Sequence, residues 1–135
     1  MQRFTAGSFL LAIALFIACC GVCEAAEDMR FVDAEDDTGY YVDAASIARV
    51  SDTEFDAVVA VIKVAENRLY LYHTRFNHQA GTYRIFDARV EVYDTKEILR
   101  TMQGMDAPQV YTPASPMRGI VDFIEELLAE KQQTA

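Results

Sequence analysis

The chain has 135 residues, of which 52% are hydrophobic and 24% are charged, and its formal net charge is −9. This length fits a single domain, and the apolar content excludes an intrinsically disordered chain. The excess of acidic side chains argues against a nucleic-acid partner, because phosphate binding requires clustered Lys and Arg.

Residues 1–25 have the composition of a signal peptide. Arg3 precedes an uninterrupted apolar run over residues 9–18. This run is too short for a membrane span of about 20 residues, but it suits the hydrophobic region of a secretory signal. A small-residue cleavage site follows at Ala25. The sequence therefore predicts export to the periplasm, the cell surface or the extracellular space, with one mature domain over residues 26–135.

An alternative processing route involves the cysteines. Residues 15–19 resemble a bacterial lipoprotein signal ending at residue 18, which makes Cys19 a candidate for lipid attachment. The lipid would then be the protein's only contact with a membrane, and firm anchoring requires more than one acyl chain. All three cysteines precede residue 26, so the mature domain contains no disulfide and no thiolate site.

The N-terminal part of the mature chain predicts short strands. Residues 29–33 and 40–42 are candidate strands on either side of an acidic turn, in which Gly39 is free to adopt a positive φ. Residues 43–47 are predicted as a tight turn that Asp43 caps.

Longer strands follow at residues 55–64, 69–77, 82–93 and 97–102. Their connections are short, so we expect neighbours to pair antiparallel in a sheet of about four to six strands. Residues 55–64 are apolar on both faces, which predicts either a central strand covered on both sides or a strand with one face against a helix and the other in an interface. Residues 82–93 instead alternate between side chains expected to face the core and side chains expected to face water. The side chains expected to face the core are Phe86, Ala88, Val90 and Val92, and those expected to face water are Asp87, Arg89 and Glu91.

A C-terminal amphipathic helix is predicted to begin at Ser115 and Pro116, because Ser is a favourable N-cap and Pro fits the first helical position. Apolar residues then recur at spacings of three and four, which places them on one face. They are Met117, Ile120, Val121, Ile124, Leu127 and Leu128. Burial of this stripe predicts that the helix packs on the sheet, which makes the domain α+β.

Catalytic and metal-binding patterns are absent from the sequence. It has no Gly-x-Ser-x-Gly elbow, Walker loop or Gly-x-Gly-x-x-Gly fingerprint. His73 and His78 are five residues apart and are predicted to lie on opposite faces of the sheet, so that they share no metal. The acidic turn at residues 33–39 has Ala44 where an EF-hand requires a carboxylate. We therefore expect no catalytic residue, no metal and no cofactor.

Aromatic and basic side chains on neighbouring predicted strands form a candidate binding surface. Tyr and Arg are enriched in protein–protein interfaces, although ordinary packing within the sheet is the alternative explanation. An exposed basic patch on an acidic protein would engage an acidic partner. The candidate partner-binding residues are Tyr70, Tyr72, Arg75, Arg84 and Arg89.

Residues 40–47 resemble the surface-adhesin protein E-like family of small exported bacterial domains. The similarity continues at residues 58–64, 82–84, 92–94 and 115–116 and covers most of the mature chain. It implies an antiparallel sheet with a packed C-terminal helix, dimerisation in some members, and binding of host matrix or serum proteins by the characterised adhesin. Family members often carry a Cys near the positions of His78 and of residues 126–128 here, so the resemblance also implies that one disulfide has been lost.

These observations favour an exported, non-enzymatic, adhesin-like binding domain of the bacterial cell envelope that engages a protein partner or associates with itself. The apolar second face of residues 55–64 suggests a homodimer. Two alternatives stay open. One is a periplasmic hydrolase-type enzyme with a site of scattered Asp, His and Arg, for which the sign would be a deep pocket holding His73 and a carboxylate. The other is a structural or assembly protein of the envelope.

Overall fold

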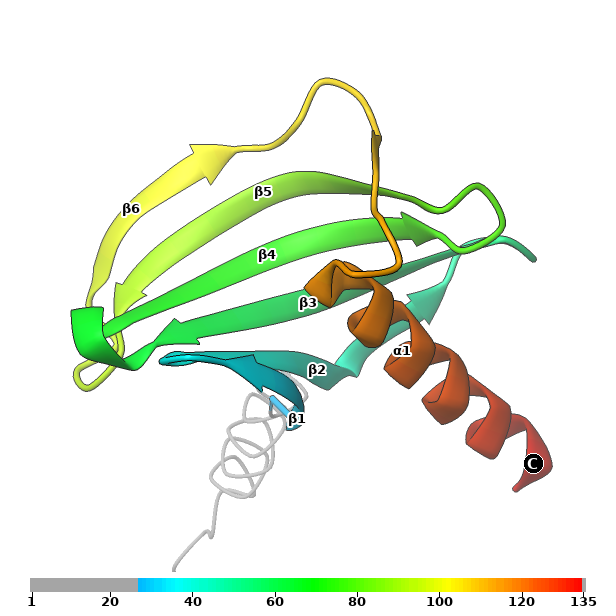
Figure 1. The fold of residues 1–135 in the computed structure, drawn as a ribbon, viewed down its shortest axis with the longest axis horizontal. Helices are drawn as coiled ribbons and strands as arrows, with labels where there is room; N and C mark the ends of the chain where they lie inside the picture. The colour runs from blue at the N-terminus through cyan, green and yellow to red at the C-terminus, as the bar shows by residue number, and fades with distance from the viewer. Residues whose placement is uncertain (1–26, 135) are drawn as a thin grey trace, which may run out of the picture.

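An antiparallel sheet with a helix packed on one face makes up the computed structural model, which describes residues 27–134 (Figure 1). The strands are β1 (Met29–Glu35), β2 (Thr38–Arg49), β3 (Glu54–Lys63), β4 (Arg68–Asn77), β5 (Thr82–Val92), β6 (Ile98–Gln103) and the two-residue β7 (Gln109–Val110). A 3-10 turn, η1 (Val64–Glu66), joins β3 to β4, and α1 spans Pro116–Gln133. The predicted α+β class is confirmed. The predicted signal sequence and Cys19 lie outside the described residues.

The sheet is a meander in which each strand from β1 to β6 pairs antiparallel with the next strand in the chain. The short β7 pairs with the beginning of β5, at Thr82 and Tyr83. The connecting turns use residues in the left-handed region, which are Asp36, Asn67, Gly81 and Lys96. In the first turn this conformation falls on Asp36 and not on Gly39, which lies within β2.

The predicted turn at residues 43–47 is wrong, because this segment continues β2. The pairing of β2 with β3 shifts register between Asp43 and Ala48. Oδ1 of Asp43 accepts a hydrogen bond from the N–H of Ala45 at 3.1 Å. Oγ of Ser46 donates to the Asp43 carbonyl at 2.7 Å and accepts from the N–H of Val58 at 2.8 Å. These side chains replace hydrogen bonds of the ladder, so the strand bulges where the sequence predicts a turn.

Helix α1 covers one face of the sheet, called here the helix face. Oγ of Ser115 accepts a hydrogen bond from the N–H of Met117 at 3.2 Å, which confirms the predicted cap. Ile120, Val121 and Ile124 are buried, as the stripe predicts. The main core cluster joins them to residues of the sheet and of the segment before the helix, namely Val42, Phe55, Ala57, Val59, Phe76 and Tyr111.

A second, smaller apolar cluster lies on the other face, called here the open face because no described helix covers it (Figure 1). Its buried members are Ala60, Leu69 and Leu71. Residues on β3 therefore contribute to apolar clusters on both faces, which is the arrangement that its sequence predicts. Period-2 alternation also places His73 on the open face, whereas His78 stacks on Phe55 of the helix-face core.

A β-bulge changes the predicted faces of β5. The pairing with β4 shifts register after His73, and the shift leaves Phe86 without a partner residue. The ring of Phe86 lies 5.5 Å from that of His73 on the open face, so the prediction that it faces the core is wrong. Ala88 and Val90 are buried as predicted. Glu91, predicted to face water, is only 7% exposed.

Candidate functional site

The five candidate partner-binding residues divide between the two faces. Tyr72 lies opposite Val59 of β3, a member of the helix-face core, and Tyr70 is on the same face of β4. Arg75 lies opposite Asp56 and Arg84, and its guanidinium covers Phe86 on the open face. Arg89 pairs with Leu71, which is also on the open face. The structure therefore separates the tyrosines from the arginines.

Tyr70 and Tyr72 form a stacked pair, with ring centroids 6.3 Å apart and planes inclined by 6°. Both side chains are partly buried. Burial raises the pKa of the Tyr72 phenol, and the Tyr70 phenol adds to the rise, whereas Arg100 opposes it. Arg100 lies on β6 opposite Val90, which itself lies opposite Tyr70. The arginine that accompanies the tyrosines is therefore Arg100, which the sequence analysis missed.

Strand β6 forms one edge of the sheet, because it pairs with β5 on one side and with no other strand of residues 27–134. Its first two residues leave large apolar side chains in solvent, with Ile98 55% and Leu99 45% exposed. Arg100 is the only charged residue in the strand. Tyr70, Tyr72 and strand β6 together form a surface called here the tyrosine edge.

The three arginines of the open face make contacts within the domain. Arg75 donates two hydrogen bonds to the carboxylate of Asp56, at 2.8 and 3.0 Å, and these bonds raise its pKa above the ordinary value. Arg84 donates to the carbonyl oxygen of Met105 at 3.2 Å. Nε of Arg89 lies 3.0 Å from a carboxylate oxygen of Glu91, although without the angle of a hydrogen bond. The contacts of Arg75 connect β4 with β3, and the hydrogen bond of Arg84 connects β5 with the segment after β6.

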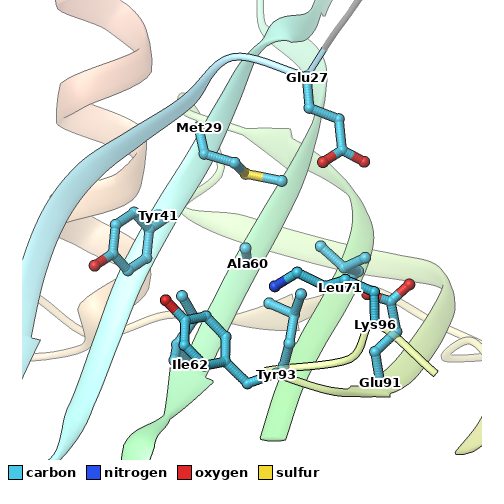
Figure 2. A pocket seen from close by; sticks show the side chains of 10 residues that line it. Glu27, Met29, Tyr41, Ala60, Ile62, Leu71, Glu91, Tyr93 and Lys96 are labelled. Carbon is cyan, nitrogen blue, oxygen red and sulfur yellow. The ribbon is translucent and has the colours of Figure 1, made fainter. Parts of the chain in front are cut away.

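A groove of about 410 Å³ lies on the open face (Figure 2). Its lining comes from the five neighbouring strands β1 to β5, from Glu27 before β1 and from the turn after β5. The apolar lining residues are Met29, Tyr41, Ala60, Ile62, Leu69 and Leu71, and the polar ones are Glu27, Glu91, Tyr93 and Lys96. The sequence shows the apolar second face of β3, but it does not show that the small side chain of Ala60 lies among larger neighbours at the floor of a groove.

Next to this groove is a polar hollow of about 170 Å³ that contains His73 and Asp87. Nδ1 of His73 lies 3.4 Å from a carboxylate oxygen of Asp87. The two side chains are 46% and 69% exposed, so this pair lies in an open hollow.

Within residues 27–134, no group of three or more His, Cys, Asp or Glu side chains is arranged to hold a metal ion. In the same part of the chain, no helix combines the length and the apolar character needed to cross a membrane.

Comparisons with protein-family models, with curated proteins and with solved structures gave no match.

Proposed function

We propose that this chain is an exported, non-catalytic binding domain of the bacterial cell envelope, and that it engages a protein partner through the tyrosine edge. The observation that carries the proposal is the stacked pair Tyr70 and Tyr72 on β4, which one strand, β5, separates from the edge strand β6. Tyr and Arg contribute disproportionately to binding energy in interfaces, and both residue types meet here.

The edge strand supplies the main-chain part of such an interface. Within residues 27–134 no strand pairs with the outer side of β6, so its outward N–H and C=O groups can form a ladder with an extended segment of a partner. The exposed Ile98 and Leu99 add apolar contact, and Arg100 favours an acidic or aromatic group on the partner. An antiparallel pairing of β6 with β6 of a second copy satisfies the same groups, so self-association uses the same edge.

Export is a separate part of the proposal. Its support is the apolar run at residues 9–18 followed by small residues, and the resemblance to exported adhesin-like domains is consistent with it. Mass spectrometry of the protein isolated from cells tests this part. A chain that begins at Ala26, or one that carries lipid on Cys19, supports export. An intact precursor in the cytosol contradicts it.

The binding surface is tested by chemical cross-linking and sedimentation of the isolated protein with two variants. Tyr70→Ser combined with Arg100→Glu alters the tyrosine edge, whereas Arg118→Glu makes the same charge reversal on the exposed surface of α1 and serves as the control. We expect the double variant alone to lose the cross-linked complex or dimer. A wild-type protein that is monomeric and forms no cross-linked complex in envelope extracts contradicts the proposal.

The hydrolase alternative makes a different prediction. Turnover of an ester, peptide or glycoside substrate that is lost in His73→Ala would contradict the non-catalytic assignment, because His73 and Asp87 form the candidate acid–base pair of the open face. We expect no such turnover.

A further inference from the structure

We propose that the groove on the open face binds a small amphiphile that has an alkyl chain and an anionic head, with Lys96 as the counter-ion of that head. The groove lies on the face of the sheet opposite to α1 and to Tyr70 and Tyr72. The proposal therefore does not depend on the protein partner at the tyrosine edge.

The floor of the groove determines the alkyl part of the ligand. Figure 2 shows Met29, Tyr41 and Ile62 around the small side chain of Ala60, with Leu71 on the other side. Seven of the ten lining residues are apolar or aromatic, and six of these come from the adjacent strands β1 to β4, which makes a continuous apolar surface. A volume of about 410 Å³ lies in the range of small-molecule sites. Apolar surface of this kind favours a flexible chain over a polar ligand.

Lys96 determines the sign of the head group. Its Nζ lies 4.3 Å from the centroid of the Tyr93 ring, and Figure 2 shows both side chains at the same end of the groove. Within residues 27–134 no carboxylate lies within 4.0 Å of this ammonium group, so that an anion bound there meets an uncompensated positive charge.

The two carboxylates that line the groove, those of Glu27 and Glu91, do not pair with the ammonium group of Lys96. Glu91 is 7% exposed, and its carboxylate oxygen lies 3.0 Å from Nε of Arg89. Glu27 projects from the opposite end of the groove in Figure 2, away from Tyr93. The electrostatic asymmetry of the site therefore places the anionic head near Lys96 and the alkyl chain along the floor.

The backbone at Lys96 supports a role for this side chain. Three non-glycine residues in the described part of the chain have positive φ, and two of them, Asp36 and Asn67, are of types that tolerate this conformation. Lys96, at φ 62°, is not. Its N–H donates to the carbonyl of Val92 at 2.8 Å, which fixes the turn. A strained residue that directs a functional group into a groove is a common feature of binding sites.

The test is isothermal titration calorimetry of the full chain with four probes that share one alkyl chain. These probes are dodecanoate, dodecyl phosphate, dodecanol and dodecyltrimethylammonium. We expect the two anions to bind about tenfold tighter than the alcohol and the cation, since a charge-assisted contact to Lys96 is available only to them. The ratio of the two anions distinguishes a carboxylate ligand from a phosphate ligand. Equal affinity for all four probes, or no binding of any probe, overturns the proposal.

Variants assign the effect to the groove. Lys96→Met should reduce anion binding to the level of the alcohol, and Ile62→Trp should weaken all probes by filling the floor. Lys63→Met is the matched control, because its Nζ also lies over a tyrosine, 5.6 Å from the Tyr70 centroid and outside the groove. Unchanged binding in Lys96→Met refutes the proposal. The proposal is also refuted if the wild type binds no probe and forms a dimer that Ile62→Trp dissociates. In that case a second copy of the chain occupies the groove.

A further variant separates folding from binding. Lys96→Gly removes the strain of the left-handed conformation and should raise the melting temperature while it lowers the affinity for dodecanoate about tenfold. A residue that served only to close the turn would show the first effect without the second.

Discussion

Replacing Gly104 by Ala should destabilise the domain more than a single added methyl group suggests. Gly104 follows β6, and a Cβ atom there would come within 3.0 Å of the carbonyl oxygens of Ile85 and Phe86. Both are backbone atoms, so the linker must move away from β5. This movement breaks the hydrogen bond from the N–H of Met105 to the Ile85 carbonyl, now 2.8 Å long. The lost hydrogen bond costs about 1 kcal/mol and the steric displacement about 1–3 kcal/mol, giving about 2–4 kcal/mol in total.

Urea denaturation followed by circular dichroism measures this loss, and Gly119→Ala provides the control. Gly119 lies in α1, and a Cβ atom there would have no neighbour within 4 Å. Ala in a helix interior is more favourable than Gly, so this variant should gain about 0.5–1 kcal/mol. The same chemical change thus has opposite effects at two positions. A Gly104→Ala protein as stable as the wild type would show that the linker does not pass this close to β5.

Three other predictions concern single side chains. Burial raises the pKa of the Tyr72 phenol in the folded state. The contribution of the neutral phenol to stability is therefore complete below about pH 10 and is lost as the pH rises through the folded pKa. The loss of stability at alkaline pH, measured by urea titration, should be smaller in Tyr72→Phe. Ser115→Ala removes the cap of α1 and should cost about 1 kcal/mol in thermal unfolding, whereas Ser115→Asp should retain most of the stability. Asp56→Asn should cost at most about 1 kcal/mol, because Arg75 is partly exposed, and the cost should shrink when the titration is repeated in high salt. A salt-independent loss would show that packing and not charge is responsible.

Local signals in the sequence were sufficient for most elements. The cap at Ser115 and the apolar stripe of α1 depend on neighbours within a few residues, and both were predicted correctly. The segment at residues 43–47 was predicted wrongly because Asp43 and Ser46 favour a turn locally. The N–H of Val58, on a different strand, donates to Ser46 and keeps the segment in the sheet. Long-range contacts of this kind leave no trace in local composition.

The candidate surface was only partly predictable for the same reason. Alternation along β4 is sufficient to place Tyr70 and Tyr72 on one face and Arg75 on the other. The sequence therefore already contains the signal that separates the tyrosines from Arg75. The position of Phe86 was not predictable, because the bulge in β5 lies where Gly104 and Met105 of the linker contact that strand. Arg100 was missed because its proximity to the tyrosines requires the register of three strands.

The meander order of the sheet has a consequence for how the domain folds. Every strand from β1 to β6 finds its partner in the adjacent part of the chain, so each hairpin closes a short loop at a small entropic cost. Only α1 has to return to the beginning of the sheet, where it contacts β1 and β2. Topologies with mainly local pairing fold rapidly, and docking of the helix closes the longest loop. The sheet can therefore assemble from local hairpins, and burial of the helix-face core requires the later return of α1.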